Sequence, residues 1–492
     1  LDRYFNNQSV ANLPPSAPTN LTAYGVGGKW VLRWNKVGND DHTSSNLIRY
    51  QVAVRTQANT NFTYASTNVA LATHNGRDQS HGAMGNVPIS NFFRTSVSNI
   101  SRTIVWKVRA IDSAYKAGPW SALRTNYPSP VVNLNLLVGY QSITNAFNDP
   151  SLANGHVIEV APGIYQENVR ILSRTNITLR AKSYILSGVR TNTIIRATGN
   201  AVQAIDVNNS SRCVIRGFTI TRGSNIGINL STGISRSNLI VNNLLRSNYY
   251  AIACGENSDF TTITSNVFDG AGYSTAGIDI GSADFCVVSN NVVRGGGYGI
   301  VTTSAAYNRI IDNVISSNDL SGVYLQSPGN TNNYFAGNAF DGKGYQNRGA
   351  EYINLTGGFD TWTNNVFRNH TQAGIQFNNA SPGYRIVNNV FSNNTGANLT
   401  IFGGVGVQVV AGNRMDGGGM TGYGILIQNT NRGAVISNNK IKSHTTHGMD
   451  IQNYYISNYI VGNEIFSNTF GGINFQPSAR GKSSRIIRNR IH

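Results

Sequence analysis

The stretch that decides the fold is SNVFDGAGYSTAGIDIGSADFCVVSNNVVRGGGYGIVT, residues 265–302. It contains the same pattern twice. Asn266 and Asn291 are each followed by an apolar pair, and each copy then reaches a short Gly-Ile strand, GIDI at 277 and GIVT at 299. Apolar patches of this length, returning at a fixed interval of twenty-odd residues with an Asn at one turn, are typical of a solenoid of strands.

The pattern extends well beyond this stretch in both directions. Strands of the Gly-Ile kind begin at 227, 251, 277, 299, 322, 374, 424, 448 and 472, with the first intervals being 24, 26, 22 and 23 residues. The Asn returns once per coil, at Asn243, Asn266, Asn291, Asn313, Asn338, Asn365, Asn389, Asn413, Asn439, Asn463 and Asn489. Stacked Asn side chains can hydrogen-bond along a ladder, so we interpret this row as structural.

Residues 131–492 resemble the right-handed parallel β-helix of the pectin-lyase-like superfamily. GHVIEVAPGIYQENVRI (155–171) resembles the first coil of that fold. Before it, Ile143, Ala146 and Phe147 have helical spacing, which predicts an amphipathic N-terminal cap at about 140–150. The expected domain is an all-β solenoid of about 13 coils.

Residues 13–128, after an N-terminal extension (1–12), have a different texture. KWVLRW (29–34), IRYQVAVR (48–55) and IVWKVRAID (104–112) alternate apolar with polar residues, as half-buried antiparallel strands do. With the opening PPSAPTNLTA, Trp34 and Tyr50, this segment resembles a fibronectin type III β-sandwich. The resemblance implies that the two aromatic residues are core positions and that the domain is a spacer or binding module without catalysis.

The charge balance indicates a polyanionic partner. The net charge is +17 although only 12% of residues are charged, which favours an acidic or sulfated polysaccharide. Arginine that serves only solubility is the alternative. The chain lacks the Lys/Arg runs and interleaved aromatic residues that would favour nucleic acid. It also lacks an apolar run of about 18 residues that could span a membrane.

The start of the chain and its cysteines bear on where the protein acts. It begins at Leu1 without an initiator Met or a signal-type apolar run, which fits a processed, secreted protein or a trimmed one. We expect an extracellular or cell-surface location. Cys213 and Cys286 occupy similar positions three coils apart, roughly 14 Å, which is beyond bridging distance. With Cys254 in another row, all three are expected to be buried free thiols.

Asp279, in GIDI, is the first candidate for chemistry. Strand alternation places Ile278 and Ile280 in the core and turns Asp279 outward, so we expect it to carry no burial penalty. Aligning the coils predicts a face with only two acids, in the row Asn229, Ala253, Asp279, Val301, Tyr324, Asn354, Gln376, Thr400, Leu426, Asp450 and Asn474.

Two reactions remain open on this face. Enzymes of the resembled superfamily include pectate lyases, polygalacturonases, mannuronan epimerases and chondroitin lyases, but their signature motifs are largely missing. Hydrolysis needs an acid and a base, for which Glu256 and Asp279 are candidates if the chain turns between them. Elimination needs a charge neutraliser and a base, for which Arg294 with Tyr298 or Tyr324 are candidates.

Each of these residues can equally be an ordinary exposed group on a solenoid face. His447 with Asp450 is a second, weaker candidate site. Acids are too sparse for a calcium cage, and we expect no metal and no cofactor. The residues three positions after each Asn partly alternate in charge, as in Arg246, Asp269 and Arg294, which predicts a structural salt-bridge ladder.

The leading hypothesis is that the protein binds and cleaves an acidic polysaccharide on an outward face of the β-helix, as a lyase or a glycoside hydrolase. The alternative is a non-catalytic structural or adhesive protein. The chain ends at SSRIIRNRIH (483–492), partway through a coil, and an open coil has unpaired strand edges. The alternative therefore includes a homo-oligomer or filament that stacks through this end.

Overall fold

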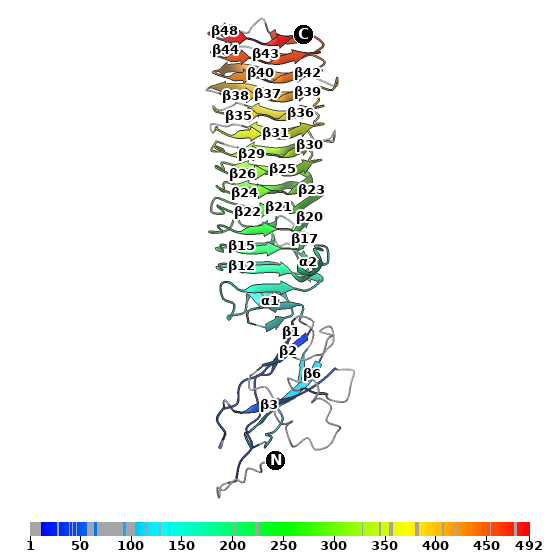
Figure 1. Ribbon diagram of the computed structural model, residues 1–492, viewed down its shortest axis with the longest axis vertical. Helices are drawn as coiled ribbons and strands as arrows, with labels where there is room; N and C mark the ends of the chain where they lie inside the picture. The colour runs from blue at the N-terminus through cyan, green and yellow to red at the C-terminus, as the bar shows by residue number, and fades with distance from the viewer. Residues whose placement is uncertain are drawn as a thin grey trace. The chain divides into compact units, whose positions relative to one another are not determined.

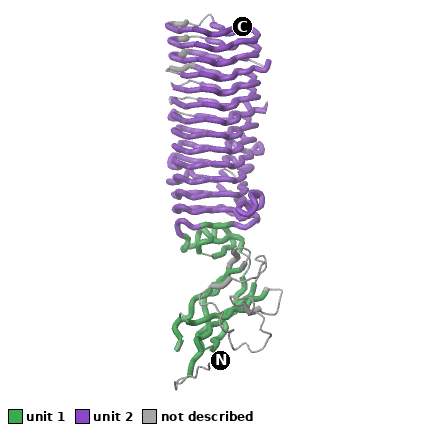
Figure 2. The backbone as a smooth tube through the Cα atoms, viewed as in Figure 1, with its two compact units in different colours: residues 1–152, 157–159 green, residues 153–156, 160–492 purple. Residues whose placement is uncertain are grey.

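The computed structural model describes residues 11–26, 29–38, 40–41, 43–45, 47–56, 63–65, 92–94, 104–114, 116–126, 129–136, 138–199, 203–221, 226–326, 328–343, 346–353, 358–378, 383–405, 408–419, 422–452, 454–476 and 480–492. The chain forms two compact units, residues 1–152 with 157–159 and residues 153–156 with 160–492 (Figure 2). The first unit is built from small antiparallel sheets and the second is a parallel solenoid. Residues from 131 to 152 therefore group with the N-terminal unit.

The first unit has two antiparallel sheets. One contains β1 (Thr22–Val26), β2 (Lys29–Arg33) and β5 (Phe92–Arg94) in the order β1-β2-β5, and the other contains β3 (Arg49–Thr56), β4 (Thr63–Ala65), β6 (Ile104–Ile111) and β7 (Arg124–Asn126) in the order β4-β3-β6-β7. The three alternating segments named above thus form β2, β3 and β6.

The core of this unit is aromatic. Trp34, Tyr50 and Trp106 are buried together, with ring centroids 5.3 Å apart for Trp34 and Tyr50 and 6.3 Å for the two tryptophans. The Tyr50 hydroxyl accepts a hydrogen bond from the Val37 amide at 2.8 Å, which satisfies its polar end. The alternation read from the sequence therefore identified residues of a real core.

A hairpin of β8 (Val131–Asn133) and β9 (Val138–Tyr140) follows, and then α1 (Ile143–Phe147) and β10 (Val157–Val160). Ser142 accepts a hydrogen bond from the Asn145 amide and so caps the N-terminus of α1. Ile143, Ala146 and Phe147 are its buried residues, as their spacing indicated.

The second unit is a right-handed β-solenoid of about 12 turns (Figure 1). Each turn adds one strand to each of three parallel stacks. Stack 1 contains β13 (Thr178–Ala181), β16 (Val214–Arg216), β19 (Leu239–Val241), β22 (Thr262–Thr264), β24 (Val287–Ser289), β26 (Arg309–Ile311), β29 (Tyr334–Ala336), β32 (Thr361–Thr363), β35 (Arg385–Val387), β38 (Val409–Ala411), β41 (Val435–Ser437), β45 (Tyr459–Val461) and β49 (Arg485–Ile487).

Stack 2 begins directly after the Asn of each coil. It contains β11 (Gly163–Gln166), β14 (Thr193–Arg196), β17 (Thr219–Thr221), β20 (Leu244–Arg246), the first parts of β23 (Val267–Gly281) and β25 (Val292–Thr303), β27 (Val314–Ser316), β30 (Ala339–Asp341), β33 (Val366–Arg368), β36 (Val390–Ser392), β39 (Arg414–Asp416), β42 (Lys440–Lys442), β46 (Glu464–Phe466) and β50 (Arg490–Ile491).

Stack 3 carries the Gly-Ile strands. It contains β12 (Val169–Leu172), β15 (Gln203–Asn208), β18 (Ile226–Asn229), β21 (Tyr250–Ala253), the second parts of β23 and β25, β28 (Ser321–Gln326), β31 (Arg348–Ile353), β34 (Ala373–Asn378), β37 (Ala397–Val405), β40 (Tyr423–Arg432), β43 (His447–Ile451) and β47 (Gly471–Phe475), with β44 (Tyr454–Ile456) and β48 (Arg480–Lys482) beside them. The short helix α2 (Lys182–Ser187), which no sequence pattern predicted, follows β13.

The Asn ladder holds the turn between stacks 1 and 2. The backbone amide and the side-chain Nδ2 of Asn313, for example, both donate to Oδ1 of Asn338 at 3.0 Å. Asn338 Nδ2 in turn donates to the Ile310 carbonyl and to Oδ1 of Asn365. Each Asn thus satisfies buried backbone groups that a turn leaves unpaired, which confirms the structural interpretation.

The cysteine and charge-ladder predictions are confirmed as well. Cys213, Cys254 and Cys286 are all buried and free. Arg246 lies 3.4 Å from Asp269, and the next coils repeat such pairs, with Arg368 at 2.9 Å from Asp341 and Lys442 at 2.8 Å from Asp416.

Candidate functional site

Asp279 lies on stack 3 with its side chain outward, between Ala253 and Val301 of the adjacent coils. Ile278 and Ile280, on either side, are fully buried in the core. The outward direction was predicted correctly, but the expected lack of a burial penalty was wrong. The carboxylate is half-buried, and burial raises its pKa from 3.8 to about 6, against the opposing effect of the Gly281 amide, which donates to Oδ1 at 2.9 Å.

Two tyrosines lie on the coils on either side of Asp279. The register places Tyr250, Ala276 and Tyr298 in one row on three successive coils, three residues before the Asp279 row. Coils stack about 4.8 Å apart, so the two tyrosine positions lie about two strand spacings apart, with the fully buried Ala276 between them. We call Tyr250, Ala276, Tyr298 and Asp279 the tyrosine notch.

The hydroxyls of the notch remain protonated near neutral pH. Burial raises the pKa of Tyr250, and the nearby charge of Asp279 raises it further. Burial likewise raises the pKa of Tyr298, with the neighbouring Tyr324 adding to the shift. The notch therefore combines a carboxylate that ionises near pH 6 with hydroxyls that can donate protons, which is an acid and base pair set apart by environment.

Tyr298 and Tyr324 are brought together, as expected for a shared site. Their rings stack with centroids 4.5 Å apart and an interplanar angle of 25°. Since Tyr324 covers one side of Tyr298, the other side of that ring is turned toward the coil of Ala276. Tyr324 therefore supports one wall of the notch.

The Asp279 row contains more acids than the sequence alignment predicted. β31 pairs Glu351, not Asn354, with Tyr324 on one side and Gln376 on the other. Asp206 precedes Asn229 in the same row. The error arose because the segment EYINL (351–355) was aligned with GIDI (277–280). Gly349 was the available signal, because its Cα takes the crowded position of Gly322 and Gly374, where a Cβ would lie within 2.6 Å of a backbone oxygen. Asn354 lies outside the described residues.

The added acids are held in hydrogen bonds, whereas Asp279 is less constrained. Glu351 accepts from Ser321 at 3.0 Å and from Arg348 at 3.1 Å. Asp206 accepts from two neighbours, Asn229 at 3.0 Å and Thr232 at 2.8 Å. Among the described residues, Asp279 accepts from the Gly281 amide alone. It is the acid of this row with the most freedom to exchange a proton with a ligand.

Glu256 does not share the strand of the notch. It is exposed in the turn after β21, and the register sets Ala253 rather than Glu256 beside Asp279. The two carboxylates are thus offset by three residues along the chain. Their cooperation in hydrolysis remains a prediction.

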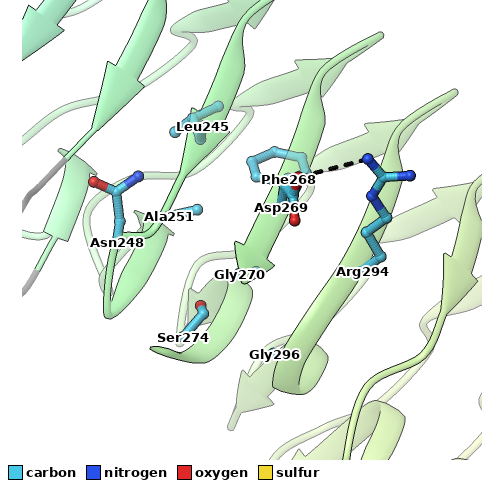
Figure 3. Close-up of a pocket in the computed structure, with 10 residues that line it drawn as sticks. Leu245, Asn248, Ala251, Phe268, Asp269, Gly270, Ser274, Arg294 and Gly296 are labelled. Carbon is cyan, nitrogen blue, oxygen red and sulfur yellow. Dashed lines mark hydrogen bonds and ion pairs between the residues drawn. The ribbon is translucent and has the colours of Figure 1, made fainter. Parts of the chain in front are cut away.

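Arg294 lies in the stack 2 part of β25, whereas Tyr298 lies in its stack 3 part. Figure 3 shows its guanidinium directed at Asp269, with the two groups 3.5 Å apart, in a pocket that Phe268 and Leu245 also line. The pocket holds about 10 Å³, the space of roughly one water molecule, so a sugar cannot enter it. Arg294 belongs to the salt-bridge ladder in this structure, and its role as charge neutraliser remains a prediction.

His447 and Asp450 lie on one strand, β43, in the same two rows as Tyr298 and Asp279. Asp450 is fully buried and accepts from Asn474 at 2.6 Å and from Gln452 at 2.8 Å. The His447 ring lies parallel to that of Tyr423, with centroids 6.5 Å apart. Because the Asp450 carboxylate already accepts hydrogen bonds from neighbouring side chains, it is less available to a ligand than the carboxylate of Asp279.

Among the described residues there is no group of three or more His, Cys, Asp or Glu side chains that could hold a metal ion. In the part of the chain that the structure describes, no helix is both long and apolar enough to cross a membrane.

Comparison with known proteins places the fold. Residues 261–391 match the family described as "Right handed beta helix region". No curated protein matches the chain. Among solved structures, the A-module of a mannuronan C-5 epimerase of Azotobacter vinelandii is 16% identical, covering 70% of this chain and 94% of its own at a TM-score of 0.42.

Two further structures represent other classes. PfbA, a surface adhesin of Streptococcus pneumoniae, is 12% identical over 68% of this chain and 88% of its own, with a TM-score of 0.42. A family 28 exopolygalacturonase of Yersinia enterocolitica is 10% identical over 96% and 99%, with a TM-score of 0.33. No function is taken from these likenesses.

Proposed function

We propose that the protein binds an acidic polysaccharide along the outer face of stack 3 and cleaves it at the tyrosine notch. The observation that carries this proposal is Asp279, a half-buried carboxylate whose pKa is raised to about 6 between two tyrosines. Perturbed groups of this kind concentrate at functional sites. The net charge of +17 supports an anionic polymer as the ligand, since it raises the rate of encounter.

Elimination fits the notch better than hydrolysis. Asp279 removes the proton from the carbon next to the uronate carboxylate, and the electrons of that C–H bond form a carbon–carbon double bond. The adjacent C–O bond to the next sugar breaks, and the hydroxyl of Tyr298 or Tyr250 gives its proton to the leaving oxygen. Hydrolysis would require a second carboxylate at roughly 5 to 9.5 Å, and the residues beside Asp279 in the stack are Ala253 and Val301.

Two further parts of the proposal concern context. A polysaccharide of this kind is met outside the cytoplasm, so we place the protein at the cell surface or in the extracellular medium. We also assign the two antiparallel sheets of the N-terminal unit to a fibronectin type III-like sandwich. The buried cluster of Trp34, Tyr50 and Trp106 supports that assignment.

The test is incubation with polygalacturonate, alginate, chondroitin sulfate and a neutral β-glucan. Absorbance of new double bonds reports elimination, and reducing ends report any cleavage. We expect Asp279→Asn to lower the rate at least a hundredfold and Tyr298→Phe or Tyr250→Phe to lower it at least tenfold. Asp269→Asn, which removes an acid from the salt-bridge ladder only, is the matched control and should retain the wild-type rate.

The alternative function makes the opposite prediction. Binding without turnover on every polymer would reject the enzyme and favour an adhesive or structural protein. Electron micrographs of the same sample would then report whether the chain forms filaments.

A further inference from the structure

A row of exposed aromatic residues lies at a different corner of the coil. Phe260, Phe285, Tyr307 and Phe359 each stand two residues before a strand of stack 1, in β22, β24, β26 and β32. Backbone hydrogen bonds link these turns from coil to coil, with the Phe260 amide donating to Asp284 and the Phe285 amide to Ala306. Asn332 fills the one coil between Tyr307 and Phe359. We call these four side chains the aromatic turn row.

The rings of this row are stacked and open to solvent. Phe260 and Phe285 have centroids 5.2 Å apart and Phe285 and Tyr307 5.0 Å, with interplanar angles of 8° and 4°. The four side chains are between 46% and 60% exposed. Rings in direct contact lie about 3.5 Å apart, so centroids at these separations mean offset rings, with part of each face uncovered.

The backbone at these positions does not favour large side chains. Phe260, Phe285, Tyr307 and Phe359 have φ values of +59°, +57°, +57° and +64°. Bulky residues adopt this left-handed conformation only at an energetic cost, which is a reason to look for function. Other coils of the same row place small or polar residues there, namely Asn176, Arg212, Ser237, Asn332, Gly383, Gly433, Ser457 and Ser483. The turn itself therefore does not require an aromatic ring.

The shape of the row favours a linear polymer over a protein. It is one side chain wide and extends over four coil spacings, about 19 Å. Four half-exposed rings offer about 400 Å² if each aromatic side chain has about 200 Å² in all, about half of the roughly 800 Å² per partner in a stable protein interface. A polysaccharide chain aligned with the solenoid needs only a ridge of this kind.

We propose that the aromatic turn row is a second polysaccharide-binding surface, separate from the tyrosine notch. Sugar rings present C–H groups on their faces, and the electron-rich faces of the aromatic rings attract these groups. The contact is made once per coil, so a chain lying along the axis meets a ring at nearly every step. The inference rests on the proposed polysaccharide ligand but not on cleavage. In this proposal the aromatic turn row holds a long polysaccharide chain while the tyrosine notch cleaves one of its bonds.

The test uses the full chain with Phe260, Phe285 and Tyr307 all changed to Asn, which the same row accepts at Asn332. Native gels cast with polygalacturonate, alginate, chondroitin sulfate or a neutral β-glucan measure retardation, and titration calorimetry gives the Kd of each polymer that binds. We expect the triple variant to bind at least tenfold more weakly, with an unchanged melting temperature or a higher one. If the triple variant does not fold, the single variant Phe285→Asn replaces it in the test. We expect this single change to weaken binding about threefold.

Controls separate this inference from the proposed function. Tyr459→Asn removes an exposed aromatic residue of stack 1 outside the row and should bind as the wild type does. Asp279→Asn should lose turnover and keep polymer binding, whereas the triple variant should keep turnover on short oligosaccharides.

Three outcomes would overturn the inference. The first is unchanged binding of every polymer by the triple variant. The second is a wild-type dimer in sedimentation velocity that the triple variant lacks, which would assign the row to a second copy of the chain. The third is a wild-type protein that binds no polymer of the panel, which would reject the proposed ligand class as well.

Discussion

Single residues in this solenoid take their chemistry from what covers them. Asp279 points outward, as alternation requires, yet it is half-buried between the adjacent coils, where Ala253 and Val301 are its neighbours in the row. The removal of water disfavours the charged form, so the carboxyl ionises near pH 6 instead of near its ordinary value. The direction of a side chain is a local property, whereas its solvation is not.

The raised pKa of Asp279 predicts how the rate of cleavage depends on pH. A base acts only when ionised, so kcat/KM on the best polyuronate should rise with pH and level off, with an apparent pKa of about 6. Rates from about pH 4.5 to 8 measure this limb. A rate that falls through this range would assign Asp279 the role of general acid, and a flat profile would remove it from the reaction.

Substitution of the buried Asp360 is expected to change the stability of the fold without changing the tyrosine notch. It is buried in a row where neighbouring coils place Asn308 and Asn333, and it accepts a hydrogen bond from the Asn333 amide at 2.7 Å. Burial raises its pKa from 3.8 to about 7. The unfolded chain ionises more readily than the folded one, so folding loses stability as pH rises from about 4 to 7.

Asp360→Asn should therefore stabilise the protein by about 2–4 kcal/mol above pH 7 and by almost nothing near pH 4. Urea unfolding at both pH values gives the difference. Asp341→Asn is the opposite control. Although burial raises the pKa of Asp341, hydrogen bonds from Asn369 and the Lys343 amide outweigh it and lower the pKa. Its loss should destabilise at neutral pH, and equal effects of the two changes would contradict this account.

At the scale of elements, each coil is held by turns as much as by strands. The backbone amide of Asn313 donates to Oδ1 of Asn338, and the Asn338 side chain in turn donates to the Ile310 carbonyl and to Asn365. A solenoid turn has no helix or sheet partner for these groups, and the side-chain amide supplies one. The Asn row thus stabilises the turns of the coils from Asn243 onward.

Asn338→Ala tests this stabilisation. It leaves the buried backbone amide of Asn313 without its acceptor and the Ile310 carbonyl without the Asn338 side-chain donor, and we expect a loss of about 2–5 kcal/mol in the free energy of unfolding, measured in urea. Asn332→Gly, at an exposed turn with a φ of +55°, is the matched control and should change stability by less than about 0.5 kcal/mol. Similar losses in both variants would mean that the ladder adds nothing beyond ordinary turn chemistry.

At the scale of the molecule, charge and repetition act together. Few residues are charged, yet basic ones exceed acidic ones by 17, so a long polyanion meets attraction over many coils. Attraction of this kind is screened by salt, whereas contacts of aromatic rings with sugar are not. The two proposed surfaces therefore differ in their response to ionic strength.

Raising NaCl from about 0.05 to 0.5 M should weaken binding of polygalacturonate or another polyanion at least tenfold, because the Debye length falls. Binding of a neutral polymer to the aromatic turn row should change less than about twofold. Calorimetry at both salt concentrations measures the difference. If the Kd of the polyanion does not change with salt concentration, the net charge of the protein no longer supports an anionic ligand.

The repeat made most of the solenoid predictable, and particular residues show where prediction stopped. Asn243 to Asn489 marked the coils from residue 243 onward, and Cys213 and Cys286 could be assigned as free thiols from their register alone. Glu351 was misplaced because an insertion lengthened its coil, and only the strand pairing of β31 with β28 set the register. Phe260 and Phe285 were not singled out from the sequence, since nothing in one coil reveals that the aromatic ring of the next coil stacks upon it.

The sequence by itself determined the β-helix, the Asn ladder, the salt-bridge ladder and the direction of Asp279, because each follows from a period that local chemistry repeats. Only the tertiary structure decided the pKa of Asp279, the four acids of its row, the pairing of Arg294 with Asp269 and the stacking of the aromatic turn row. Those properties depend on residues from adjacent coils, some twenty or more positions apart, whose contacts exist only once the coils are stacked.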